Sequence, residues 1–250
     1  MRASDVTSLI VRAGAHNLQN SARESGVQDV GVKLVVKHKD FTMETLVRKL
    51  STSEWLWRSS NFPVRTKRER DQTTFFSLQH SDIAILVLKE PIKYTATVRA
   101  VCLPKGKDTY AGQKGTVVGW GLLRESGSRP TVLQELTMEI WDNARCSSTY
   151  GSTAPAGIKD TMLCAGKKGK DSCSVSNIWE KSILSAASVA FFKLQGDSGG
   201  PFVKPVGNHW EQIGVVSWGI GCGKDIYPGV YTRVTHMMEW IDKVRGLYPN

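Results

Sequence analysis

The 250-residue sequence lacks an apolar run of the roughly 20 residues that a membrane-spanning helix requires. Its run at residues 183–192 is too short for that role. The opening letters, MRASDVTSLIV, also lack a charged flank followed by an apolar stretch, which is the pattern of an export signal. We therefore expect no membrane segment, no leader and no membrane partner for this chain.

Acidic residues are too few to balance the basic ones. The chain has 33 Lys and Arg against 23 Asp and Glu, which gives a net charge of +10. The excess is uneven, because residues 47–79 alone hold seven basic and three acidic residues. A modest surplus over the rest of the chain is typical of a solvated surface, so we expect no nucleic-acid partner.

Cysteine is scarce and odd in number, at five residues. One interpretation is a cytosolic protein with free thiols. The other is a disulfide-bonded protein in which one cysteine pairs with a partner outside the chain. The spacing of the cysteines does not choose between these alternatives.

Most of the sequence consists of short segments that are either apolar or alternate between apolar and polar residues, with turn residues between them. Only residues 236–244 have apolar residues at the spacing of a helix. Many short strands with turns between them predict an all-β sandwich or barrel. We expect the strands at residues 8–13, 30–38, 83–88, 115–123, 133–141, 213–218 and 229–234.

Five short motifs follow one another along the chain. They are HSDIAILVL around Asp82, GWG at 119–121, GDSGGP around Ser198, SWG at 217–219 and PGVY at 228–231. In this order they resemble the trypsin-like (chymotrypsin-family) serine proteases over most of the chain. The resemblance implies an all-β fold of two antiparallel six-stranded β-barrels with a C-terminal α-helix.

The resemblance also divides the chain. Residues 1–250 would form one peptidase S1 (trypsin-like) domain. Residues 1–105 would be an N-terminal barrel that is incomplete, and residues 106–250 would be the C-terminal barrel with its helix. The missing strands would leave unpaired edges on the first barrel.

In this family a serine attacks the scissile carbonyl and forms an acyl-enzyme, so the resemblance implies a serine endopeptidase. Ser198 would be the nucleophile, and Asp82 would orient the histidine that acts as its base. The backbone N–H groups of Gly196 and Ser198 would bind the oxyanion. Asp197 would pair with the new amino terminus that zymogen activation creates. This chemistry needs no metal or cofactor, and we expect none.

The resemblance further implies cleavage after Arg or Lys, in protein or peptide substrates. Asp171 matches the carboxylate at the base of the pocket that accepts these side chains. A buried carboxylate without a cationic partner is costly, so a long cationic side chain suits it. Ser217, Trp218, Gly219 and Gly229 match the other substrate-binding positions, and the two glycines leave room in the pocket walls.

The same resemblance implies how the cysteines pair in disulfides. Cys146 would pair with Cys164, and Cys173 would pair with Cys222 and brace the pocket. Pairs of this kind imply an oxidising compartment, so we expect a secreted, extracellular protein.

A further disulfide of many family members has its two positions at Gly115 and Lys204, so both of its partners are absent here. Cys102 then stays unpaired within the chain. It matches the cysteine that ties the protease domain to an upstream propeptide or light chain. We therefore expect a zymogen-type protease, with an upstream propeptide or a clip domain as the partner of Cys102.

The catalytic histidine is the main departure from the family pattern. The family places it a few residues before a stretch like 4–18, which would put it upstream of Met1. We expect the chain as written to be inactive for this reason. The alternative is a non-catalytic homologue that acts as a binding partner in a protease cascade, although the intact Ser198, Asp82 and Asp171 favour an enzyme. The five histidines, none of which matches the catalytic position, are His16, His38, His80, His209 and His236.

Two blocks interrupt the family pattern, at residues 47–79 and 175–195. Both begin with Val and end with Gln, whose codons can carry the donor and acceptor ends of an intron. We therefore interpret them as retained introns translated in frame. The alternative is a pair of surface loops at the rim of the cleft, where insertions are tolerated. In that case Trp55, Trp57 and Phe62 in the first block would form an exosite.

Overall fold

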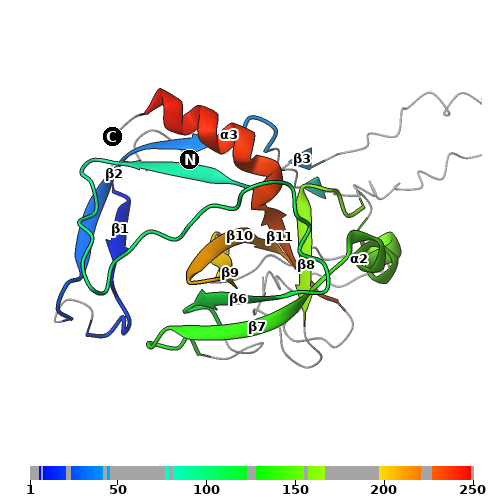
Figure 1. The fold of residues 1–250 in the computed structure, drawn as a ribbon, viewed down its shortest axis with the longest axis horizontal. Helices are drawn as coiled ribbons and strands as arrows, with labels where there is room; N and C mark the ends of the chain where they lie inside the picture. Colours follow the sequence, from blue (N-terminus) through cyan, green and yellow to red (C-terminus); the bar gives the residue numbers. More distant parts are fainter. Residues whose placement is uncertain are drawn as a thin grey trace, which may run out of the picture.

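Figure 1 shows the computed structural model of the protein. Its elements lie in two regions, a closed barrel and a smaller sheet, with a C-terminal helix across them. The structure describes residues 6, 8–20, 24–41, 44–45, 77–78, 81–122, 128–154, 157–166, 197–220 and 227–248.

The larger region is a closed barrel of six antiparallel strands in the order β10-β11-β8-β7-β6-β9. The ring closes where β9 pairs with both β6 and β10. All-β structure with a C-terminal helix is confirmed, and the barrel lies wholly within residues 106–250. Its strands are β6 (Lys114–Gly119), β7 (Gln134–Trp141), β8 (Met162–Gly166), β9 (Pro201–Val206), β10 (His209–Trp218) and β11 (Gly229–Arg233).

The barrel encloses an apolar core. Ile140, Leu163, Phe202 and Ile213 have no exposed surface, and the ring of Phe202 stacks on that of Tyr231 with 4.6 Å between centroids. Burying large apolar side chains on the inner face of a closed sheet supplies most of its stability.

The second region is a three-stranded antiparallel sheet in the order β1-β2-β5. Its strands are β1 (Ile10–Ala13), β2 (Gln28–Lys37) and β5 (Ala84–Leu88). In the described part of the chain, β1 and β5 are the edges of this sheet. A separate two-stranded pair joins β3 (Glu44–Thr45) to β4 (Ser77–Leu78). β4 lies inside the block predicted as an insertion, and the rest of that block is outside the described residues.

Helix α3 (Val234–Leu247), drawn in red in Figure 1, joins the two regions. Its inner side chains recur at helical spacing, with Val234, Met237 and Ile241 buried. They pack against Ile85 of β5 and Val215 of β10. The helix is longer than the predicted 236–244.

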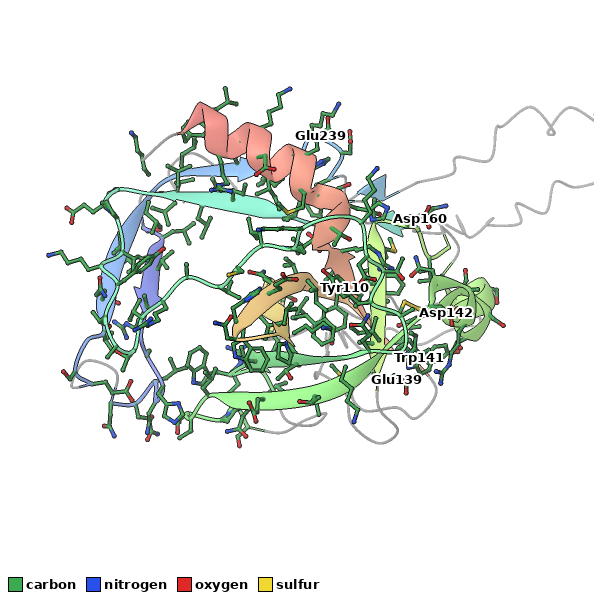
Figure 2. All side chains as sticks on the ribbon, viewed as in Figure 1. Tyr110, Glu139, Trp141, Asp142, Asp160 and Glu239 are labelled. Atoms are coloured by element: carbon green, nitrogen blue, oxygen red, sulfur yellow. A yellow bond between two sulfur atoms is a disulfide. The ribbon has the colours of Figure 1, made fainter. Side chains whose placement is uncertain are left out.

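Helix α2 (Asn143–Tyr150) and the 3₁₀ turn η3 (Gly151–Thr153) were not predicted. The carboxylate of Asp142 caps α2 by accepting the Arg145 N–H at 2.7 Å. Figure 2 places Asp142 next to Trp141, where β7 ends and α2 begins. Among the described residues, no helix is both long and apolar enough to cross a bilayer.

Several predicted strands have different ends in the structure. β6 ends at Gly119, whereas the prediction ran to residue 123, because the chain turns there around the Asp197 carboxylate. β10 begins at His209, four residues before the predicted start. Its first four residues, His209–Gln212, pair with β9, and because Trp210 is the one apolar residue among them they form no apolar run in the sequence.

Candidate active site

The loop that carries Ser198 is fixed to strand β10. Gly199 donates its N–H to the carbonyl of Val216 at 2.9 Å, and Val216 donates its own N–H to the carbonyl of Gly200 at 2.9 Å. Gly200 also closes a tight turn by donating to the carbonyl of Asp197 at 2.7 Å. Gly199 has φ +83°, which a side chain would disfavour. Ser198 therefore sits in a turn that is closed by one backbone bond and held to β10 by two others.

Asp82 lies just before β5, in the smaller sheet, but its side chain is bound by the barrel. The hydroxyl of Ser217 donates to its carboxylate oxygen Oδ2 at 2.7 Å. The hydroxyl of Thr232 donates to the Asp82 backbone carbonyl at 2.7 Å. Since Val216 holds the Ser198 loop and Ser217 holds Asp82, adjacent residues of β10 anchor the nucleophile loop and the acid.

The Asp197 carboxylate is packed against the turn that follows β6. Gly121 donates its N–H to Oδ1 at 2.7 Å. A Cβ at Gly119 or at Gly121 would collide with the carboxylate, so both positions require glycine. Burial raises the pKa of Asp197 above its ordinary value, and the Gly121 bond opposes that change.

The predicted pocket walls lie on β10 and β11. A Cβ placed on Gly219 would meet the Cα of Gly229 at 3.7 Å, so the two glycines face each other. Ser217 is buried, and Trp218 is half-buried against the cluster that contains Tyr150 and Val230.

Tyr150 braces both walls and was not predicted from the sequence. Its hydroxyl donates to the carbonyl of Pro228, next to Gly229, at 2.5 Å. Its ring contacts those of Trp218 and Tyr227, each at 5.1 Å between centroids. The contact with Pro228 spans 78 residues of sequence, so no local pattern could have indicated it.

The disulfide Cys146–Cys164 joins α2 to β8 in the same buried cluster as Tyr150. Cys102 is exposed and carries a free thiol. Its backbone pairs in parallel with Glu211 of β10.

Several predicted site residues lie outside the described part of the chain. These are the pocket acid Asp171, the oxyanion-hole residue Gly196, and the cysteines Cys173 and Cys222. His80 and the block 175–195 are also outside it.

The described histidines hold other positions. The ring of His38 contacts that of Trp240, with centroids 5.0 Å apart. His209 lies 3.3 Å from the Glu211 carboxylate. His236 lies on α3, where burial lowers its pKa. His16 lies in the loop between β1 and β2.

Among the described residues, no group of three or more His, Cys, Asp or Glu side chains is arranged to hold a metal ion.

The sequence matches the trypsin family over residues 3–174 and 190–241. The chain belongs to that family. The match covers most of the chain and confirms the resemblance that the motifs indicated.

Curated relatives agree with this assignment. "Transmembrane protease serine 11B" from Homo sapiens is 40% identical over 170 residues, which are 67% of this chain and 36% of that protein. "Tryptase" from Mus musculus is 37% identical over 169 residues, 64% of this chain and 54% of that protein. "Transmembrane protease serine 11G" from Mus musculus is 35% identical over 194 residues, 74% of this chain and 40% of that protein. The chain thus spans between about a third and about half of the length of these trypsin-family relatives.

Proposed function

We propose that this chain is the peptidase domain of a serine endopeptidase that cleaves after Arg or Lys through an acyl-enzyme. The observation that carries the proposal is the double anchor on β10. Val216 holds the Ser198 loop, and Ser217 donates to the Asp82 carboxylate. A nucleophile and an acid from distant parts of a trypsin-family chain are therefore tied to one strand.

The chemistry follows from the roles that these groups take in acyl transfer. Ser198 Oγ attacks the scissile carbonyl while a histidine removes its proton. Asp82, fixed by the Ser217 hydroxyl, orients that histidine and stabilises its charged form. The N–H groups of Gly196 and Ser198 stabilise the oxyanion of the tetrahedral intermediate.

Specificity for Arg and Lys is assigned to Asp171, which matches the family's carboxylate for binding these side chains. The facing glycines Gly219 and Gly229 support this proposal, because small walls admit a long side chain. Trp218 and Ser217 complete the substrate-binding side of β10.

Zymogen activation is assigned to Asp197. Its carboxylate is partly buried and has a raised pKa, so a cation beside it would be favoured. A new amino terminus, created by cleavage of a propeptide, is such a cation. Exposed Cys102 would tether the propeptide or a clip domain, in a secreted, extracellular protein.

The general base is the missing part of this scheme. None of the five histidines matches the catalytic position, so residues 1–250 alone should not hydrolyse peptides. A histidine in a longer form of the protein would complete the triad. The second candidate function is a non-catalytic homologue in a protease cascade. The observation that favours it is that His38 contacts Trp240 and His209 lies beside Glu211, so each ring has a partner other than Asp82.

The test is hydrolysis of arginyl, lysyl and phenylalanyl amide substrates by residues 1–250 and by the longer form. We expect the longer form to cleave the two cationic substrates. Ser198→Ala should lower its kcat by about 10⁶-fold, as removal of the nucleophile does elsewhere. Ser147→Ala, at an exposed serine of α2, is the matched control and should leave the rate unchanged.

Three results would contradict the proposal in different ways. Hydrolysis by residues 1–250 that Ser198→Ala abolishes would show that an outside histidine is unnecessary. Equal cleavage of the phenylalanyl substrate would contradict the role of Asp171. A longer form with no histidine at the triad position, and no hydrolysis, would favour the binding-partner function.

A further inference from the structure

We propose that Glu24 is a positioning residue for the Ser198 loop. It acts through residues 16–18 and the Trp120–Gly121 turn on Asp197. The inference rests on the proposed function, because it assigns to Glu24 the placing of the nucleophile. Glu24 lies in the loop between β1 and β2, outside the motifs that identify the family.

The first step is a clamp inside that loop. The Glu24 carboxylate accepts the His16 N–H at 2.7 Å through Oε2 and the Asn17 N–H at 2.8 Å through Oε1. Both carboxylate oxygens are therefore used by the backbone of one dipeptide. These two bonds hold the pKa of Glu24 below its ordinary value. Bonds from backbone N–H groups to an ionised carboxylate are stronger than neutral ones.

The second step joins the clamped dipeptide to the barrel. The His16 carbonyl accepts the Leu133 N–H at 2.9 Å and the indole N–H of Trp120 at 3.3 Å. Leu18 donates to the carbonyl of Thr131 at 2.8 Å. The loop of the smaller sheet is thus bonded to the segments that follow β6 and precede β7.

The third step leads to the nucleophile. Trp120 is followed directly by Gly121, whose N–H bonds the Asp197 carboxylate at 2.7 Å. Asp197 is followed directly by Ser198. The carboxylate also packs against Gly119 and Gly121 with no room for a Cβ, so the turn and Asp197 are in close contact.

Asp29 supplies a matched comparison. It is another carboxylate of the same region, on β2, and it accepts two bonds from the Arg12 guanidinium. Both of these side chains are exposed, and their ion pair lies across the paired strands β1 and β2. Losing the Asp29 carboxylate should therefore affect the smaller sheet without affecting the turn at Trp120.

The experiment compares Glu24→Ala and Asp29→Ala in the full 250-residue chain by NMR. The first readout is the native-state chemical shift of the Trp120 indole N–H, assigned with Trp120→Phe. The second is hydrogen exchange of the Gly121 and Gly199 amides. In Glu24→Ala we expect a displaced indole resonance and exchange at both amides that is faster by at least about fivefold, the lower end of typical coupling between sites. Asp29→Ala should leave all three signals in place.

Glu24→Gln serves if the alanine variant does not fold. It keeps one oxygen acceptor and the side-chain length, so its effects should be in the same direction and smaller. The indole shift separates positioning from general destabilisation, because a change in global stability does not move a native-state resonance.

Unchanged indole and Gly121 signals in a folded Glu24 variant would overturn the proposal. A faster Gly121 amide with an unchanged Gly199 amide would also overturn it, since the effect would then stop before the nucleophile loop. Neither readout requires hydrolysis. Failure here therefore leaves the proposed function untouched, and an inactive chain leaves this test intact.

Discussion

The closed barrel and the β1-β2-β5 sheet are built from similar apolar sequences but bury them very differently. In the barrel, Leu163 and Phe202 have no exposed surface. In the smaller sheet, Ile10 is 65% exposed and Leu86 is 43% exposed. The difference follows from closure, because a sheet closed on itself hides its whole inner face. Apolar composition alone therefore does not indicate which strands form a core.

The comparison extends to the site. Asp82 lies two residues before β5 of the smaller sheet, yet the barrel residues Ser217 and Thr232 bind its side chain and backbone. The loop that carries Ser198 is bonded to β10 of the barrel through Gly199 and Gly200. The barrel thus holds the nucleophile loop, and the segment that leads into the smaller sheet contributes an acid that the barrel binds.

The sharpest test of the comparison is the same substitution in both regions. Leu163→Ala should destabilise the chain by about 2–5 kcal/mol, because it leaves a cavity in a closed core. Leu86→Ala should cost less than about 1 kcal/mol, since this residue is already 43% exposed and its truncation leaves no closed cavity. Urea unfolding of both variants measures the two values. A Leu86→Ala cost equal to that of Leu163→Ala would mean that the smaller sheet is buried in solution.

A second pair contrasts two arginines. Arg233 of β11 is 2% exposed, and its guanidinium donates to the carbonyl of Met162 and to the side chain of Asn143. Arg233→Met should cost at least about 1–3 kcal/mol, the penalty for one buried acceptor without a donor. Arg12→Met removes an exposed ion pair with Asp29 and should change stability little. Thermal unfolding of both variants measures the two changes. Equal shifts in Tm would contradict the expected difference between the buried and the exposed arginine.

A third pair contrasts two tyrosines. Tyr150→Phe removes the hydroxyl that binds the Pro228 carbonyl behind the pocket wall. We expect a loss of about 0.5–1.5 kcal/mol, the usual net value of one hydrogen bond. Tyr94→Phe, at a side chain 71% exposed, should have no measurable effect. Chemical denaturation at matched conditions measures both, and a silent Tyr150→Phe would refute the bracing role of α2.

The smallest effects concern two aspartates whose pKa values move in opposite directions from an ordinary 3.8. Burial raises the pKa of Asp197, whereas the Arg12 guanidinium lowers that of Asp29. The charge of Asp197 thus opposes folding above its folded pKa, and this penalty disappears as the pH falls through that value. The charge of Asp29 favours folding above its unfolded pKa, and this contribution is lost as the pH falls through its lower folded pKa. Carboxyl NMR titration should find the two values on opposite sides of 3.8, and the same side for both would contradict this assignment.

The sequence predicted some of the barrel strands closely. The segment at 229–234 corresponds to β11, and the segment at 133–141 to β7. Strand β8 was missed because its sequence, Met-Leu-Cys-Ala-Gly, shows no alternation and lacks the β-branched and aromatic residues typical of strands. Helix α2 was missed because only Cys146 and Tyr150 of its eight residues are buried. Its stability comes from the Asp142 cap and from tertiary contacts, which a periodicity cannot show.

The site was predictable only where family motifs occur. The motifs located Asp82, Ser198 and Ser217, but not the hydrogen bond that joins Ser217 to Asp82 across 135 residues. Tyr150 and Glu24 belong to no motif, and their roles depend on partners brought close by the fold. A motif indicates which residues carry the chemistry. The residues that hold those groups in place can be identified only from the folded structure.

The most direct test of the account is a covalent one. The longer form of the protein is incubated with a guanidinobenzoyl ester, and the intact mass and the modified peptide are determined. We predict a single acyl group on Ser198, lost in Ser198→Ala and strongly reduced in Asp171→Ser. Acylation that persists at the same level in Ser198→Ala would contradict the assignment of Ser198 as the nucleophile.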